Sequence, residues 1–216
     1  MVVTVTSGGY IKRTPLADFR AQRRGGKGVS GMQTKEEDVV TNLFVANTHT
    51  QLLFFTTDGM VYKLKTWRLP QGARTAKGKA IVNILPIPTG VSIAAIMPVD
   101  RDEKDWDDLQ VIFATSAGTV RRNKLSDFTN VKSNGKIAMK FEGEHEGTTL
   151  INARIASNDD DVMLVTDAGR AIRFPATDVR VFNSRNSVGV RGIRLGEDDN
   201  LVSMSVIRHF EASSEE

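Results

Sequence analysis

A short motif occurs four times in the sequence, and this internal repeat constrains the fold more than any other feature. Each copy begins with Thr, has Gly three residues later, and continues into a run of apolar and basic residues. The copies begin at Thr6, Thr56, Thr115 and Thr166, so successive threonines are 50, 59 and 51 residues apart. Such a period is typical of arrays in which each repeat is one supersecondary unit that packs on its neighbours.

Each repeat has the residue pattern of a small β-sheet. Thr-x-x-Gly between two β-rich runs predicts a hairpin, because glycine accepts the positive φ that a tight turn needs. Residues 109–115 and 162–166 are strand-like runs that enter a repeat, and helical periodicity is nearly absent. An apolar residue follows each threonine after thirteen residues, at Phe19, Leu69, Phe128 and Val179. Four strands per unit at this period predict an all-β, propeller-like ring of about four units.

The repeats predict one domain over residues 1–207, with units that start near residues 4, 54, 111 and 162. Residues 201–207 form a strand-like run of the kind that precedes the motif elsewhere, but no further motif follows it. We therefore expect the last unit to be incomplete, and residues 208–216 to be a polar tail.

Basic residues recur at the same place in every repeat. The segments 10–28, 60–79, 119–140 and 170–194 hold six Lys or Arg each, which is 24 of the 29 in the chain, but only three acids. The remaining acids cluster between these segments. A charge run is usually a solvated face, but equivalent positions in a circular array lie on the same rim. A basic rim would offer a curved track to a polyanion, with phosphate contacts that do not read bases.

We expect two groups of residues to bind DNA. The first group, called the rim cations below, is spread over all four repeats: Lys12, Arg13, Lys63, Lys65, Arg68, Arg74, Lys77, Lys79, Arg121, Arg122, Lys124, Lys136, Arg170, Arg173, Arg185 and Arg191. The second group is a heptapeptide of the first repeat that has no counterpart in the others: Gln22, Arg23, Arg24, Gly25, Gly26, Lys27 and Gly28. Its glycines let the backbone approach a phosphate closely.

The heptapeptide is identical to the "gyrase A box", and its flanks at residues 9–16 and 38–43 match as well. Later segments, at residues 52–56 and 187–193, resemble the same family, so the resemblance covers nearly the whole chain. On these residues the sequence resembles the C-terminal domain of the DNA gyrase A protein. The resemblance implies a β-pinwheel that binds, bends and wraps double-stranded DNA without sequence preference, in support of negative supercoiling.

The same resemblance implies that the remainder of the gyrase A protein and the gyrase B protein are partners, and that the location is the bacterial cytoplasm, in association with the nucleoid. It also places the chain in an ATP-dependent type II DNA topoisomerase whose catalytic residues lie in other domains. Two alternatives stay open. One is the similar domain of topoisomerase IV, in which the box is degraded or missing. The other is a β-propeller scaffold that binds an acidic protein.

No residue cluster predicts catalysis, and we expect neither a cofactor nor a metal. His49, His145 and His209 are far apart in polar stretches, without a repeated partner. Tyr10 and Tyr62 occupy equivalent strands, which indicates packing. Trp67 and Trp106 are interpreted in the same way, as packing or rim residues. The acidic runs 105–108 and 159–161 are expected to be solvated loops rather than calcium sites.

Composition excludes some further classes. The chain has no cysteine, so disulfides and thiolate metal sites are excluded, which fits a reducing cytoplasm. No apolar stretch approaches the roughly 20 residues that a membrane-spanning helix needs. The N-terminal residues alternate as a strand would and lack the apolar core of a signal peptide.

Overall fold

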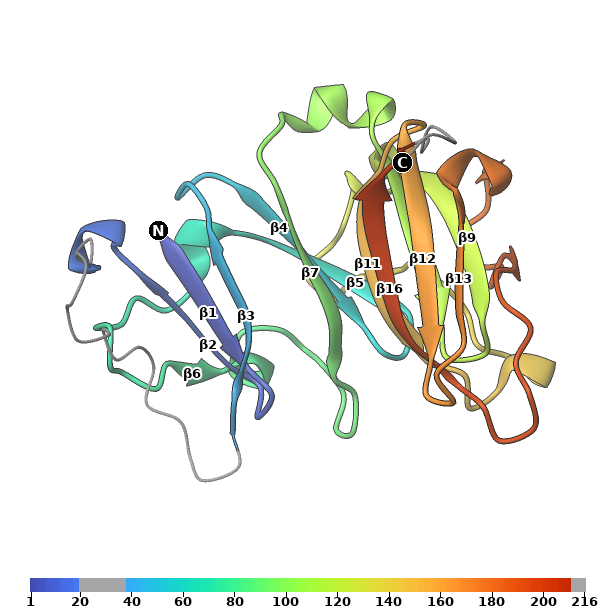
Figure 1. Ribbon diagram of the computed structural model, residues 1–216. Coiled ribbons are helices and arrows are strands. Elements are labelled where there is room, and N and C mark those ends of the chain that lie inside the picture. The colour runs from blue at the N-terminus through green and yellow to red at the C-terminus, as the bar shows by residue number, and fades with distance from the viewer. Residues whose placement is uncertain (20–37, 211–216) are drawn as a thin grey trace, which may run out of the picture.

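The computed structural model describes residues 1–19 and 38–210, which form four mainly antiparallel β-sheets joined by short 3-10 turns (Figure 1). In strand order, sheet 1 is β3 (Val40–Val45), β1 (Val2–Thr6), β2 (Tyr10–Thr14) and β6 (Lys79–Ala80). Sheet 2 is β10 (Lys136–Ile137), β5 (Met60–Lys65), β4 (Gln51–Thr56) and β7 (Ile93–Val99). Sheet 3 is β11 (Leu150–Ala156), β8 (Gln110–Thr115), β9 (Thr119–Lys124) and β14 (Val181–Phe182), with β15 (Val190–Arg191) also on β9. Sheet 4 is β13 (Ala171–Pro175), β12 (Asp160–Thr166) and β16 (Leu201–Arg208).

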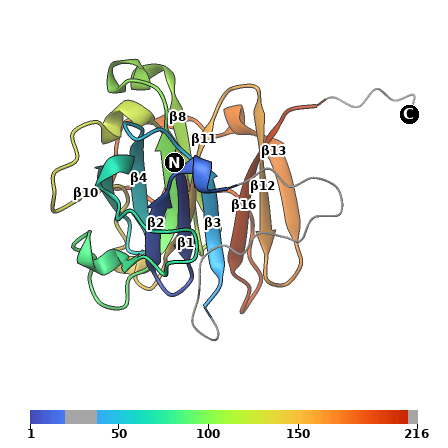
Figure 2. The same ribbon diagram turned by 90° about the vertical axis from the view of Figure 1, so that its left-hand side faces the viewer.

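The 3-10 turns connect these strands. They are η1 (Leu16–Asp18), η2 (Thr66–Arg68), η3 (Ile81–Asn83), η4 (Glu103–Asp108), η5 (Leu125–Phe128), η6 (Gly143–His145) and η7 (Ala176–Asp178). The predicted all-β, propeller-like fold is therefore confirmed, with four sheets that follow one another along an arc (Figure 1). In the view of Figure 2, the strands β12, β13 and β16 of sheet 4 stand to the right of the other sheets. β16 extends to Arg208, one residue beyond the predicted domain of residues 1–207.

The four motifs form four hairpin turns of one design. In each turn the Gly N–H donates to the carbonyl oxygen of the motif threonine, at distances from 2.9 to 3.1 Å. The four glycines, Gly9, Gly59, Gly118 and Gly169, all have φ between +77° and +85°. The threonine side chain also accepts a hydrogen bond from the N–H that follows the glycine, as between Thr56 and Met60 at 3.2 Å. The repeat therefore specifies the turn through both the glycine and the threonine.

Adjacent sheets pack face to face through alternating strand residues. Val3, Val5 and Ile11 of sheet 1 lie in one apolar cluster with Leu52 and Phe54 of sheet 2. The opposite face of sheet 2 packs on sheet 3, where Phe55, Phe113 and Phe128 make three edge-to-face contacts with centroids 5.3 to 5.7 Å apart. A third cluster joins Ile112 and Val120 of sheet 3 to Val162 and Leu164 of sheet 4. At the inner ends of sheets 2 to 4, strand β11 lies against both β7 and β16.

The outer strand of each of the first three sheets comes from the following repeat. β6 belongs to the second repeat but completes sheet 1, β10 of the third repeat completes sheet 2, and β14 and β15 of the fourth repeat complete sheet 3. The sequence predicted four strands within each repeat, so this exchange of edge strands between repeats is a correction. Sheet 4 has three strands among the described residues, and the outer edge of β13 is open there.

Glycine makes the strand exchange sterically possible. Gly78, Gly135 and Gly189 directly precede β6, β10 and β15, and each has a positive φ. A Cβ at Gly78 would lie 2.5 Å from the carbonyl oxygen of Ile11. A Cβ at Gly189 would overlap the carbonyl oxygen of Val120. The backbone of one repeat therefore approaches the neighbouring sheet more closely than any other residue permits.

Candidate nucleic-acid interface

The sixteen rim cations do not form one uniform surface. Three are buried: Lys12 is 1%, Arg121 0% and Arg122 3% exposed. The prediction that these three lie on an open rim is therefore wrong, and the physical reason lies in their hydrogen bonds. Each has an ammonium or guanidinium group that donates to backbone carbonyls of the next repeat, as described below.

Lys12 extends from β2 into a loop of the second repeat. Its Nζ donates to the carbonyl oxygen of Ala73 at 3.0 Å and to that of Arg74. Burial lowers the pKa of Lys12 below its ordinary value, and the neighbouring Arg74 charge lowers it further. The ammonium group thus replaces its water shell with carbonyl oxygens, which ties repeat 1 to repeat 2.

Arg121 has the equivalent place in the third repeat, six residues after the motif threonine. Its guanidinium donates to the carbonyl oxygens of Arg185 at 2.8 Å, Ser187 and Ala138, and its Nε donates to Asn123 Oδ1 at 2.6 Å. Burial lowers the pKa of Arg121 to about 10, and the nearby Arg185 charge acts in the same direction. A fixed five-donor fork is suited to a loop that presents several carbonyls at once.

The next position, seven residues after the threonine, also connects repeats. Arg122 donates to the carbonyl oxygens of Ala176 at 3.1 Å and Val179 at 3.4 Å, and to the Asn158 side chain. Burial lowers its pKa as well. Arg13 and Lys63 are half-buried and do the same: Arg13 Nε donates to the Leu69 carbonyl at 2.9 Å, and Lys63 Nζ donates to that of Thr129.

These five residues, Lys12, Arg13, Lys63, Arg121 and Arg122, are called the clamp cations below. Three of their carbonyl acceptors lie at or next to the apolar residue thirteen positions after the next threonine, namely Leu69, Phe128 and Val179. The sequence shows basic residues six or seven positions after a threonine and an apolar residue thirteen positions after each one. It does not show that the basic side chains of one repeat bind the backbone near the apolar residue of the next. The recurrence of basic residues therefore has two causes, and one of them is the joint between repeats.

In the fourth repeat the equivalent of the clamp cations is Arg173, which bonds within its own sheet. Its Nε donates to Asp161 Oδ2 at 2.7 Å, and Nδ1 of His209 lies 2.7 Å from Asp161 Oδ1. Burial by itself would raise the pKa of Asp161, but the hydrogen bonds and charges of His209 and Arg173 outweigh it and lower this pKa below its ordinary value. The carboxylate therefore favours the folded state while it is ionised.

We expect Asp161→Asn to destabilise the fold by a margin that depends on pH. A carboxyl with a lowered folded pKa contributes its stability above the unfolded pKa, and that contribution disappears as the pH falls through the folded pKa. The difference in Tm between the wild type and Asp161→Asn should therefore be largest near neutral pH and should become smaller below about pH 4. Thermal denaturation across this range measures it, with Asp105→Asn on exposed η4 as the control. A constant gap would contradict the assignment.

Other rim cations are exposed and available to a ligand. Lys65, Arg68, Lys79, Lys124, Arg170, Arg173 and Arg191 are exposed, whereas Arg74, Lys77, Lys136 and Arg185 are half-buried. Some of them already have partners: Lys124 Nζ binds both carboxylate oxygens of Asp107 at 2.9 and 3.1 Å, and Arg170 lies 3.9 Å from Asp199. For Lys65, Arg68, Lys77, Lys79 and Arg191, the described part of the chain provides no carboxylate partner within ion-pair distance.

The exchanged edge strands place one cation at the outer edge of each complete sheet. These edge cations are Lys79 on β6, Lys136 on β10 and Arg191 on β15. Strand β11 contacts both β7 and β16 at the opposite ends of these sheets, so Lys136 and Arg191 lie on the outward side of the arc. Lys79 lies at the end of sheet 1 that is opposite to β3. Lys136 is the most constrained of the three: its Nζ donates to the Asp127 carbonyl at 2.7 Å, and burial with the nearby Arg185 charge lowers its pKa.

The predicted heptapeptide, Gln22 to Gly28, lies outside the described residues. Its predicted role in DNA binding therefore stays a prediction.

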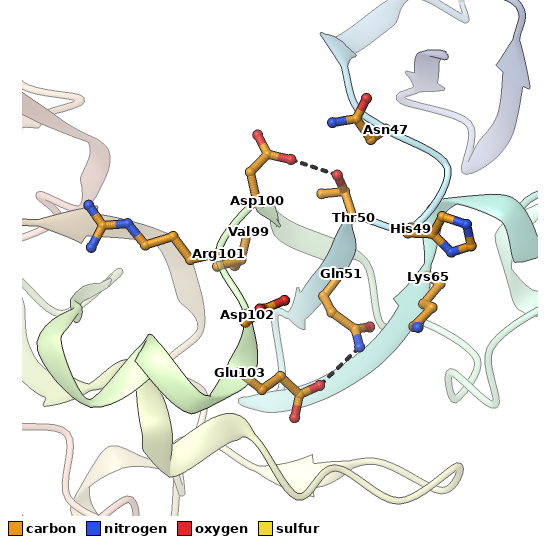
Figure 3. A pocket seen from close by; sticks show the side chains of 10 residues that line it. All are labelled: Asn47, His49, Thr50, Gln51, Lys65, Val99, Asp100, Arg101, Asp102 and Glu103. Carbon is orange, nitrogen blue, oxygen red and sulfur yellow. Dashed lines mark hydrogen bonds between the residues drawn. The ribbon is translucent and has the colours of Figure 1, made fainter.

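A pocket of about 460 Å³ lies where the chain between β3 and β4 meets the segment that leads into η4 (Figure 3). Its polar side chains bond to one another: Thr50 donates to Asp100 at 2.6 Å and Gln51 donates to Glu103 at 2.9 Å. His49 and Lys65 also line it. Within residues 1–19 and 38–210, no three His, Asp or Glu side chains are grouped so that they could hold a metal ion.

Two of the aromatic predictions can be compared with their surroundings. Tyr62 is buried, and its hydroxyl donates to the Pro86 carbonyl at 3.1 Å, as expected of a packing residue. Trp106 is 0% exposed and donates through Nε1 to the Arg101 carbonyl at 2.9 Å, whereas Trp67 is 46% exposed. A helix of sufficient length and hydropathy to cross a membrane is not found in the described part of the chain.

Comparison with known proteins assigns the family. The sequence matches the family described as "DNA gyrase C-terminal domain, beta-propeller" over residues 1–47, 50–100, 110–148 and 160–208. It is 47% identical to the DNA gyrase A protein of Rickettsia bellii over all 216 residues, and 43% identical to that of Escherichia coli K12 over 208 residues, or 96% of this chain. The chain spans about a quarter of these relatives, 24% and 23% of their lengths.

Solved structures agree with the match. The chain superposes on a structure described as DNA gyrase A C-terminal domain with a TM-score of 0.69 at 26% identity, covering 94% of this chain and 63% of that one. The C-terminal domain of DNA topoisomerase IV, at 24% identity and a TM-score of 0.76, covers 96% of this chain and 61% of its own and shows the same fold. By sequence and by fold, this chain belongs to the C-terminal domain family of the DNA gyrase A protein.

Proposed function

We propose that this chain binds double-stranded DNA along the outer edges of its sheets and bends it there. One observation supports this most: the outermost strand of each complete sheet presents a cation, at Lys79, Lys136 and Arg191. Successive sheets repeat this cation along an arc, so a stiff polyanion that follows the edges would meet one at each step. Binding of this kind engages phosphates and does not depend on base sequence.

The proposed surface is smaller than the sixteen rim cations. The clamp cations Lys12, Arg121 and Arg122 are excluded from it by burial, and Arg13 and Lys63 are engaged with the next repeat. We base it on five of the rim cations that have no carboxylate partner among the described residues: Lys65, Arg68, Lys77, Lys79 and Arg191. The acidic residues of η4 and η6 lie outside the edge strands, in the connections between β7 and β8 and between β10 and β11.

In the longer relatives such a domain is one part of the gyrase A protein. We extend the proposal to wrapping of DNA by this domain, in cooperation with the remainder of that protein and with the gyrase B protein of a bacterial enzyme. The wrap would favour negative supercoiling, with the heptapeptide, led by Arg23, Arg24 and Lys27, holding one end of it. The chemistry of strand passage, with its ATP and metal, belongs to other parts of that enzyme.

The dependence of DNA affinity on salt tests the binding surface. Five phosphate contacts predict a slope of about −4.5 for log affinity against log salt, since each contributes about −0.9. The measurement is fluorescence anisotropy of labelled duplexes of two unrelated sequences, which should give the same slope. Affinity that is flat with salt, or differs strongly between the two sequences, would overturn the proposal.

Bending is tested separately from binding. When nicked circular DNA is ligated with the chain bound, a wrapped path changes the linking number of the product. We expect a shift that grows with protein concentration until the circle is saturated. Salt-dependent binding without any shift at saturation would leave DNA binding in place and exclude wrapping by these four repeats.

A further inference from the structure

One of four equivalent 3-10 turns differs from the others in both size and charge. Turns η1, η2, η5 and η7 each begin ten residues after a motif threonine. Three of them have a small residue followed by an acid: Ala17-Asp18, Ser126-Asp127 and Thr177-Asp178. In the second repeat the same two positions are Trp67 and Arg68. The acid of the other repeats is thus replaced by a cation that stands beside the largest side chain.

The turn holds Trp67 in a defined place. The backbone N–H of Trp67 donates to the Thr48 carbonyl at 2.9 Å. The side chains on either side of the Trp67–Arg68 pair, Thr66 and Leu69, are both buried, and Leu69 is 2% exposed. The Arg68 guanidinium lies 5.2 Å from the indole centroid and covers part of the ring. The backbone on both sides is therefore fixed, and the exposure of the indole is a property of the fold rather than of a free loop.

An aromatic side chain that is 46% exposed leaves a large apolar area in water. Protein-docking surfaces usually combine several such side chains. Within sheet 2 and η2, as described, Trp67 is the one large apolar side chain that is exposed, and its exposed neighbours Lys65 and Arg68 are both cations. A single indole between two cations matches the alternation of sugar and phosphate along a nucleic-acid strand.

We infer that Trp67 and Arg68 form one contact point on the backbone of duplex DNA, in which the indole packs on a deoxyribose while Arg68 and Lys65 bind the flanking phosphates. This contact rests on the proposed function and refines it. It makes the second repeat a site of tighter attachment than its neighbours, whose equivalent turns present Asp18, Asp127 and Asp178 to the same ligand.

The chain contains its own spectroscopic test. Trp67 and Trp106 are its two tryptophans, and Trp106 is 0% exposed and hydrogen-bonded. Quenching of tryptophan fluorescence by acrylamide therefore reports mainly on Trp67. We expect unlabelled duplex DNA to protect the wild-type chain from quenching, and Trp67→Phe, which retains Trp106 alone, to show no DNA-dependent change.

Affinity measurements complete the test. Trp67→Ala should weaken duplex binding on the order of fivefold, the lower end of the cost of losing an aromatic contact to nucleic acid. Arg68→Asp, which restores the acid of the other turns, should make the salt slope shallower by about one. Val202→Ala is the matched control, because Val202 is 54% exposed but lies on β16, the inner strand of sheet 4, and it should bind as the wild type does.

The outcomes separate the two proposals. If the wild-type chain does not bind duplex DNA, the proposed function fails. If it binds with the expected salt slope but Trp67 stays open to acrylamide, or Trp67→Ala binds unchanged, the contact is wrong while DNA binding stands. Protection of Trp67 by the remainder of the enzyme, but not by DNA, would overturn the contact in favour of a protein interface.

Discussion

Arg121→Met should lower the free energy of unfolding by about 3 kcal/mol or more, because several acceptors lose their donor at once. Methionine has similar length, but it removes the donor from the buried carbonyl oxygen of Ala138 and from the partly buried ones of Arg185 and Ser187. Each unsatisfied acceptor of this kind costs about 1–3 kcal/mol. The loss should appear as a lower urea midpoint when unfolding is followed by circular dichroism.

The effect should be specific to the joint between the third and fourth repeats. Arg154→Met, on the exposed side of β11, is the control and should change stability by less than about 0.5 kcal/mol. Hydrogen exchange should show new opening of β15 in Arg121→Met before sheet 2 is affected. Equal urea midpoints for Arg121→Met and Arg154→Met would show that the carbonyls find other donors, and that Arg121 does not hold the third and fourth repeats together.

The double variant Lys79→Glu/Arg191→Glu should lose most of its DNA affinity, by at least about tenfold at low salt, because two phosphate contacts are reversed in sign. The same variant should reduce the salt slope by about two. Both side chains are exposed on edge strands, so we expect the thermal stability to change little. The measurement is duplex binding across a salt series, with Tm recorded for the same samples.

A matched control separates position from net charge. Lys104→Glu/Arg154→Glu makes the same change in net charge at two exposed residues that are not on the exchanged outer strands, on η4 and β11. If the edge cations define the path of the DNA, the control should retain most of the affinity. Equal losses in the two double variants would mean that only the overall charge matters, and the edge would not be the binding surface.

The sequence predicted the repeat, the hairpin turns and the all-β class because each depends on local chemistry. Thr-x-x-Gly fixes its own turn through a glycine of positive φ and a threonine side chain, wherever the repeat sits in space. The family resemblance was likewise local, since it was based on continuous stretches of residues. These features can be read without knowing which segments are neighbours.

The division of the cations could not be predicted, because it depends on contacts between residues more than fifty positions apart. Lys12 and Lys79 are both basic residues of one expected rim. One lies under a loop at residues 73–74, and the other stands on an outer strand. A backbone carbonyl acceptor cannot be recognised from residue type, because every residue has one. The buried cations would be distinguished only by knowing that edge strands pass from one repeat to the sheet before it.

This exchange of strands also determines how the array can be cut and how it bears load. Removal of one threonine-to-threonine unit would strip the preceding sheet of its outer strand as well, so no single repeat is an independent module. A pull applied at Lys79 by a bent polymer would be received by sheet 1 but transmitted along the chain into the second repeat. A force on any of these outer strands is therefore shared by two repeats, the one that contributes the strand and the one whose sheet holds it. Straightening the arc would have to strain all the repeats together.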